Sequence, residues 1–200
     1  MAGLHDDTRP HTFPELHGHG LRLTSWDPDS DAHVEDWFRG LTDPDFVRWN
    51  TPLIPVETRD DARKSLRAKA AQAAKGVDLT FRVTDAADGT ALGVVSLSAI
   101  DHVFRTARVG YWVLPEARGR GVATRSLVVA ARWGLTELGL YRLDLGHAIG
   151  HDASCRIAER CGFRYEGTLR GAMPAPGSPE PFKDAHLHGR IASDPEPAAP

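Results

Sequence analysis

The feature that most constrains this chain is a short stretch with two glycines and two arginines, Arg118-Gly119-Arg120-Gly121-Val122-Ala123-Thr124. An apolar, aromatic run over 109–114 precedes it and ends at Pro115. After it, apolar residues recur at helical spacing, which predicts a helix from about Gly121 to about Leu138. The stretch therefore connects a predicted strand to the first turn of a predicted helix.

The physical chemistry of this stretch favours anion binding. The first turn of a helix leaves backbone N–H groups without intrahelical partners, and the helix dipole makes that end partly positive. Gly119 and Gly121 let a bulky anion approach the backbone, and Arg118 and Arg120 carry donors that suit phosphate oxygens. We interpret the stretch as a pyrophosphate cradle. From the loop alone, the alternative is an ordinary strand-to-helix turn with surface arginines.

The apolar periodicity of the rest of the chain predicts an alternation of strands and helices. Strands are expected over 21–26, 77–83, 91–100, 141–149, 163–169 and 185–191, and helices over about 31–41, 58–74 and 153–161. Asp43-Pro44-Asp45 is expected to end the first helix, and 46–55 then forms an irregular connection. Strand hairpins followed by alternating strands and helices are typical of an α/β fold with a mixed sheet.

Two blocks of the sequence resemble the GNAT superfamily of N-acetyltransferases. The first, Gly110-Tyr111-Trp112-Val113 together with 115–124, is similar to the acetyl-CoA-binding core of that superfamily. The second, 152–170, is similar to the C-terminal signature of the branch that acetylates the N-termini of ribosomal proteins. The resemblance implies a single-domain GNAT fold, with a mixed, mostly antiparallel sheet flanked by helices and a splayed central strand pair.

The resemblance also implies which residues hold acetyl-CoA. In such proteins the strand before the cradle carries a bulge and splays from its neighbour, and the thioester arm lies in the gap. By this resemblance, backbone groups of Trp112, Val113 and Leu114 would hold the arm and its carbonyl. The pyrophosphate would be held by the N–H groups of Arg118, Gly119, Arg120, Gly121, Val122, Ala123 and Thr124.

Ser154 and His151 are the candidate catalytic residues, and both are also assigned to cofactor binding. Ser154 matches the serine that related enzymes place near the CoA sulfur, where its hydroxyl would stabilise or protonate the leaving thiolate. The alternative is a helix-start serine that satisfies local backbone. His151 stands where the family commonly has an asparagine that faces the cofactor arm. Its imidazole can donate to a carbonyl or take a proton near neutral pH, and the alternative is an exposed loop histidine.

The general base stays open in the sequence. Relatives often have a carboxylate just before the Gly-Tyr-Trp run, but this chain has Arg108 there. A water chain is one alternative, and other titratable candidates are Asp101, His102, Glu116 and Glu166. Four aromatic residues are expected to pack in the core or sheet, although a phenol could serve as the acid. These four are Phe46, Trp49, Tyr111 and Tyr165.

Taken together, the features predict an acetyl-CoA-dependent N-acetyltransferase. We expect direct attack of a primary amine on the thioester without an acyl-enzyme, because neither cysteine has an evident base partner. The acceptor is a protein N-terminus or a small-molecule amine, and its determinants are expected in 46–55 and 173–181. The alternatives are a catalytically inactive CoA-binding module and a transferase for a longer acyl group.

No metal is expected from the sequence. Cys155 and Cys161 lie six residues apart on one predicted helix, so neither a disulfide nor a zinc site follows from them. His147 and His151 form no complete ligand set. The remaining pair, His186 and His188, shares one strand face without an obvious acidic third ligand.

Composition and length bound the remaining classes. With 200 residues and 41% hydrophobic content, the chain suits one domain with a sizeable core. We place this domain at 19–192, between a flexible arm at 1–18 and a disordered tail at 193–200. The net charge of −3 gives no global attraction to nucleic acid or membrane. With no signal-like or membrane-spanning run, we expect a cytoplasmic protein, either a monomer or a homodimer.

Overall fold

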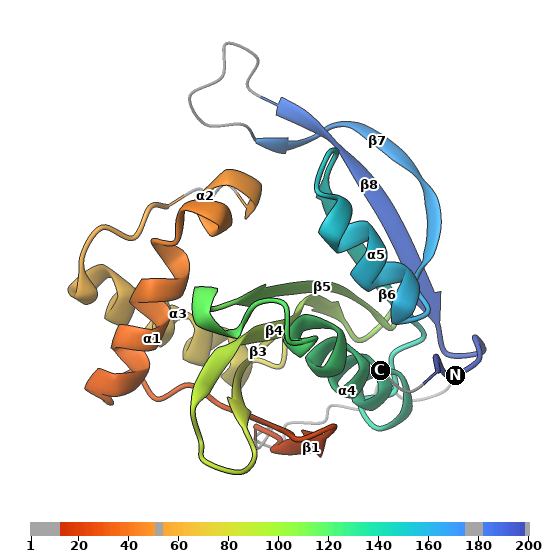
Figure 1. The fold of residues 1–200 in the computed structure, drawn as a ribbon. Coiled ribbons are helices and arrows are strands. Elements are labelled where there is room, and N and C mark those ends of the chain that lie inside the picture. The colour runs from red at the N-terminus through yellow and green to blue at the C-terminus, as the bar shows by residue number, and fades with distance from the viewer. Residues whose placement is uncertain (1–12, 51–53, 175–181, 199–200) are drawn as a thin grey trace.

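The computed structural model describes residues 13–50, 54–174 and 182–198. Eight strands form one sheet in the order β1-β2-β3-β4-β5-β6-β8-β7 (Figure 1). The strands are β1 (Leu16–Gly18), β2 (Leu21–Thr24), β3 (Asp78–Asp85), β4 (Ala91–Asp101), β5 (Thr106–Val113), β6 (Arg142–Ala148), β7 (Arg164–Pro174) and β8 (Phe182–Ile191). The helices are α1 (Asp31–Leu41), α2 (Pro44–Asn50), α3 (Arg59–Ala74), α4 (Val122–Thr136) and α5 (Asp152–Arg160), with a short 3-10 turn η1 (Pro115–Ala117).

The sheet has apolar clusters on both of its faces, because successive side chains of a strand point to opposite sides. In β4, Val94 packs with Trp37 of α1 and Leu66 of α3. The next residue, Val95, belongs to a larger cluster that includes Leu127 of α4. This arrangement explains why β4 has apolar residues on both faces, and it confirms the predicted central strand. No helix in the described ranges is long and apolar enough to cross a membrane.

The sheet opens at its centre, between β5 and β6. These two strands pair in parallel from Thr106↔Arg142 to Val109↔Leu145, whereas the other neighbouring strands pair antiparallel. β5 continues to Val113 and β6 to Ala148 without further pairing between them. The mixed, mostly antiparallel sheet with a splayed central pair is therefore confirmed.

The bulge expected in β5 lies in β4 instead. Pairing of the two strands runs without a break from Ser98↔Arg108 to Gly93↔Val113. The register shifts occur in β4, one between Ser98 and Asp101 and one opposite the Val83/Thr84 step of β3. At the second shift, Gly93 has φ +158°, and an added Cβ would lie only 2.3 Å from the Trp112 carbonyl oxygen. Glycine is thus required there for close backbone approach.

The first part of the connection after α1 is helical, which corrects the expected irregular segment over 46–50, whereas residues 54 and 55 are irregular as expected. Asp43 Oδ1 accepts hydrogen bonds of 3.1 Å from the backbone N–H groups of Asp45 and Phe46. Pro44 occupies the first helical position of α2, where the N–H that proline lacks would have no helical partner. The Asp-Pro-Asp sequence therefore starts a helix as well as ending one. Residues 51–53 of the predicted connection lie outside the described residues.

Both ends of the domain are more structured than expected. β1 pairs with β2, so the sheet begins inside the segment that we assigned to the arm. At the other end, Asp194 accepts the backbone N–H of Ile191 at 2.9 Å. Glu196 pairs with the buried Arg190 guanidinium at 3.2 Å, and a buried charge needs such a partner. The described part of the tail is thus attached to the domain, and the rest of the arm and tail lies outside the described residues.

Candidate active site

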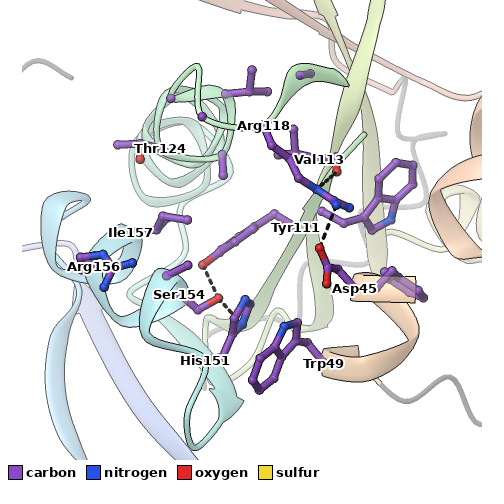
Figure 2. A pocket seen from close by; sticks show the side chains of 18 of the residues that line it. Asp45, Trp49, Tyr111, Val113, Arg118, Thr124, His151, Ser154, Arg156 and Ile157 are labelled. Atoms are coloured by element: carbon purple, nitrogen blue, oxygen red, sulfur yellow. Dashed lines mark hydrogen bonds and ion pairs between the residues drawn. The ribbon is translucent and has the colours of Figure 1, made fainter. Parts of the chain in front are cut away.

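A cavity of about 530 Å³ opens where β5 and β6 separate. This volume lies within the range of small-molecule sites. Its walls are the end of β5, the connection from η1 into α4, one face of α5 and one side of α2 (Figure 2). The sequence placed each of these elements near a ligand: β5, the α4 start and the start of α5 near the cofactor, and the segment 46–55, which overlaps α2, near the acceptor.

The start of α4 forms one wall of this cavity. Gly121 precedes the helix with φ +70°, and no side chain caps the helix end. The first helical hydrogen bond runs from the Arg125 N–H to the Gly121 carbonyl at 3.0 Å, so the three N–H groups before Arg125 precede the helical ladder. An added Cβ at Gly119 or Gly121 would meet nothing within 4 Å. The predicted helix start is therefore confirmed, and its glycines border open space.

The two cradle arginines differ in their surroundings. Arg118 is held by carboxylates of the α2 start: it forms an ion pair with Asp43 and one of 2.9 Å with Asp45. Its Nε also donates to the Val113 carbonyl at 3.2 Å. Arg120 is more exposed, and its guanidinium lies 4.0 Å from the Asp85 carboxylate. The Arg118 side chain thus ties α2 to the end of β5. Its backbone N–H, which was expected to hold the pyrophosphate, donates to the Pro115 carbonyl at 3.3 Å.

A chain of three side chains crosses the base of the cavity (Figure 2). The Tyr111 hydroxyl donates to Ser154 Oγ at 3.1 Å, and Ser154 Oγ lies 2.9 Å from His151 Nδ1. The second contact can run in either sense, because the tautomer of His151 decides which group donates. Ser154 is only 4% exposed, and its hydroxyl contacts side chains rather than local backbone. Tyr111, which was expected to pack in the sheet with its phenol as an alternative acid, is therefore a functional candidate.

The family of the chain is decided by comparison with known sequences. Residues 21–164 of the 200 match the acetyltransferase (GNAT) domain family. This chain belongs to the GNAT acetyltransferase family.

Two curated relatives are similar to this GNAT chain over shorter regions. A candidate ribosomal N-acetyltransferase of Bacillus subtilis strain 168, YdaF, is 35% identical over 86 residues, which are 43% of this chain and 47% of that protein. Spermidine N(1)-acetyltransferase of Escherichia coli K12 is 38% identical over 82 residues, which are 41% of this chain and 44% of that protein. The matched region thus spans about half of the length of each relative.

Solved structures share the GNAT fold. Mycobacterium smegmatis RimJ in complex with CoA-disulfide superimposes with a TM-score of 0.77 and 23% sequence identity, covering 92% of this chain and 88% of that one. At this level of identity the likeness bears on the fold, and it confirms the GNAT architecture expected from the sequence.

Burial sets the protonation states of Tyr111 and His151 in this GNAT site. Burial raises the pKa of the Tyr111 phenol well above its usual range, so the hydroxyl remains a donor. Burial, with the nearby His147, lowers the pKa of His151, so its imidazole is neutral near pH 7. Ser154 therefore lies between a persistent donor and a neutral base.

The buried histidines predict that acid destabilises the protein before its carboxylates titrate. Burial lowers the pKa values of His147, His151 and His188 below 6.5. Between those lowered values and 6.5 the unfolded chain binds more protons than the folded chain, so this part of the stability is complete above about pH 6.5 and falls below it. We expect the Tm, measured by calorimetry with EDTA present, to fall between about pH 7 and about pH 5.5. A flat or rising Tm contradicts this account.

Aromatic rings of α2 line the site instead of the core, which corrects our expectation. No residue of α2 is buried, and both Phe46 and Trp49 line the cavity. The Trp49 ring stacks on His151 at 4.5 Å with an interplanar angle of 12° (Figure 2). Tyr165 was also expected to be buried, but it is 52% exposed.

The candidate bases named from the sequence lie away from the cavity. Glu116 pairs with Arg39 and Glu166 with Arg142, which are structural ion pairs. Asp101 accepts two backbone N–H groups in the turn after β4. None of Asp101, His102, Arg108, Glu116 and Glu166 is among the described residues that line the cavity. Two arginines of α5 do line it, Arg156 and Arg160, and sequence spacing gave no signal for them.

Proposed function

We propose that this chain is an acetyl-CoA-dependent N-acetyltransferase that acts on the N-terminal amine of a peptide or protein. One observation carries the proposal: the glycine-bordered, uncapped start of α4 and the Tyr111–Ser154–His151 chain face the same cavity, at the point where the sheet opens. The first feature suits a diphosphate. The second suits proton transfer beside a thioester.

The residues of the cavity fit two parts of CoA, its diphosphate and its pantetheine arm. The N–H groups from Gly119 to Thr124 would hold the diphosphate, since no side chain caps them. The edge of β5 from Gly110 to Val113 has no β6 partner, and its backbone would bind the amide groups of the arm as a neighbouring strand does. Acetyl-CoA would supply the thioester carbonyl that the amine attacks.

The hydrogen-bonded residues Tyr111, Ser154 and His151 would carry the proton transfers of the reaction. Forming the amide removes one proton from the attacking nitrogen, and the leaving sulfur gains one. In the tautomer with a proton on Nδ1, His151 would take the amine proton on Nε2 and pass its Nδ1 proton to Ser154 Oγ. Ser154 would pass its own proton to the sulfur. Tyr111 would stabilise the developing charge on Oγ by its hydrogen bond.

The charges around the cavity favour a peptide over a polyamine as acceptor. Among the described residues that line the cavity, Asp45 is the only one with a carboxylate, and Arg118 already pairs with it at 2.9 Å. Arg156 and Arg160 add positive charge to the wall. A polycation such as spermidine would meet repulsion there, whereas a peptide brings a single amine to be deprotonated. Residues 175–181 of the segments expected to select the acceptor lie outside the described residues.

The test is an acceptor panel with release of the CoA thiol and acetylation of the acceptor both measured. The panel contains peptides with free alanine, serine or methionine at the N-terminus, the same peptides with blocked N-termini, and spermidine. We expect thiol release and a mass gain of one acetyl group with free peptides and not with blocked ones. Preference for spermidine would overturn the acceptor assignment. CoA binding without transfer to any amine would favour an inactive binding module, and faster transfer from longer acyl-CoA donors would overturn the acetyl assignment.

A further inference from the structure

Four potential metal ligands meet beside the candidate active site, although the sequence predicted no metal. They are His147 of β6, Cys155 of α5, and His186 and His188 of β8, and their ligand atoms all lie within 4.8 Å of one another. Three of the separations are short: His147 Nε2 to His188 Nε2 is 3.3 Å, Cys155 Sγ to His186 Nδ1 is 3.4 Å, and Cys155 Sγ to His188 Nε2 is 3.7 Å. The fold thus gathers three imidazoles and a thiol from three elements.

These separations match those of a tetrahedral zinc site. Zinc bonds to nitrogen are about 2.0–2.1 Å and to sulfur about 2.3 Å, so tetrahedral ligands lie roughly 3.3 Å apart for two nitrogens and roughly 3.6 Å apart for nitrogen and sulfur. The other separations within the cluster are at most 4.8 Å, so small side-chain adjustments would bring these pairs to the same spacing. Four protein ligands leave no open position, which is the pattern of structural rather than catalytic zinc.

Sheet pairing places the three histidines on one face, and a backbone carbonyl orients the ring of His147. His147 is paired with His186 across β6 and β8, and His188 follows on the same face of β8. His147 Nδ1 lies 3.0 Å from the Ala148 carbonyl, so Nδ1 carries a proton and Nε2 presents its lone pair to the cluster. Burial lowers the pKa values of His147 and His188, so both imidazoles are in the neutral, metal-binding form near pH 7.

The surroundings suit a cation and provide access to it. His147 and His188 are buried, whereas Cys155 and His186 are partly exposed and leave a route from solvent. Burial raises the pKa of the Cys155 thiol, and carboxylates of α5 add to this rise. The same carboxylates, Glu159 and Asp152, would stabilise a bound cation that displaces the thiol proton.

We propose that His147, Cys155, His186 and His188 bind one zinc(II) ion as a structural site. The ion would tie the first turns of α5 to β6 and β8. Because Cys155 directly follows Ser154, this link would fix the position of the Ser154 hydroxyl in the cavity. A hydrogen-bonded cluster of histidines and a thiol without metal is the competing account.

Cobalt titration of the untagged, EDTA-treated protein separates the two accounts. Cobalt(II) in such a site gives intense visible d–d bands of tetrahedral geometry and a near-ultraviolet thiolate-to-cobalt band. We expect saturation at one cobalt per chain and stoichiometric displacement by zinc. We also expect zinc at a hundredfold excess over its Kd to raise the Tm by about 5 °C or more. Absence of tetrahedral bands in the wild-type protein overturns the proposal, whatever the variants do.

Matched cysteine variants assign the thiolate. Cys155→Ser should abolish the thiolate band and weaken cobalt binding about 100-fold or more. Cys161→Ser should keep both, because Cys161 contacts the Thr124 carbonyl at 3.5 Å and lies outside the cluster. Where Cys155→Ser does not fold, His186→Asn at the partly exposed ligand replaces it, with the same expected loss of affinity. Equal spectra and affinities for the Cys155→Ser and Cys161→Ser proteins overturn the proposal.

Discussion

The Ser154→Ala protein is expected to show a kcat about 100-fold below that of the wild-type protein, with the KM for acetyl-CoA changed less than about threefold. Ser154 Oγ lies between the Tyr111 hydroxyl and His151 Nδ1, so its removal breaks the path that we propose for the proton to the sulfur. The amides that we propose to bind the diphosphate are on another wall of the cavity and are left intact. Steady-state thiol release at saturating peptide measures both constants.

A second buried serine provides the matched control. Ser126 is 1% exposed, and its hydroxyl donates to the Ala123 carbonyl within α4 at 3.2 Å. Ser126→Ala therefore removes a buried hydroxyl without changing the contacts among Tyr111, Ser154 and His151. We expect the kcat of the Ser126→Ala protein to stay within about threefold of wild type. Tyr111→Phe should lower kcat by less than Ser154→Ala does, because it removes the supporting donor only. Equal rates for Ser154→Ala and wild type would reduce Ser154 to a packing role.

The Gly121→Val protein is expected to bind CoA about 30-fold more weakly than wild type, since two or more charge-assisted hydrogen bonds would be lost or lengthened. Gly121 has φ +70° and borders the open cavity at the helix start. A branched side chain there would occupy the space in front of the cradle amides. Isothermal titration of CoA into the protein measures the change.

A control must separate the effect of backbone strain at Gly121 from the effect of a side chain that fills the space in front of the amides. Any β-branched residue at a left-handed position costs about 1–2 kcal/mol of stability. Gly139 has φ +76° and, like Gly121, no atom within 4 Å of an added Cβ, but it does not line the cavity. Gly139→Val should therefore lower the Tm about as much as Gly121→Val while keeping the wild-type Kd for CoA. An unchanged Kd in Gly121→Val, or an equal loss in both variants, would contradict the cradle.

Features encoded within one short stretch were predictable from the sequence. The start of α4 is such a case, because Gly121 and the apolar spacing after it fix both the helix boundary and the uncapped end. The central strand β4 is another, since its apolar residues on both faces require cover from two sides. By contrast, the Asp43-Pro44-Asp45 sequence is compatible with the end of one helix and with the start of another. Only the structure shows that Pro44 begins α2.

Features that depend on long-range pairing were not predictable. The contact of Trp49 with His151 joins two segments far apart in the sequence, and an aromatic residue in a connection is equally suited to a core. The meeting of Cys155 with His186 and His188 depends on how α5 packs against β8. Spacing along the chain carries no signal for that contact. The sequence left the phenol of Tyr111 as an alternative acid and could not pair it with Ser154, which lies 43 residues away.

The most direct measurement is a crystal structure of this chain with CoA or a non-hydrolysable acetyl-CoA analogue bound. We expect density for the diphosphate within hydrogen-bond distance of the N–H groups between Gly119 and Thr124. We also expect the arm to lie along the unpaired edge of β5, with the sulfur within reach of Ser154 Oγ. A diphosphate bound elsewhere, or an arm that leaves the gap between β5 and β6 empty, would contradict it.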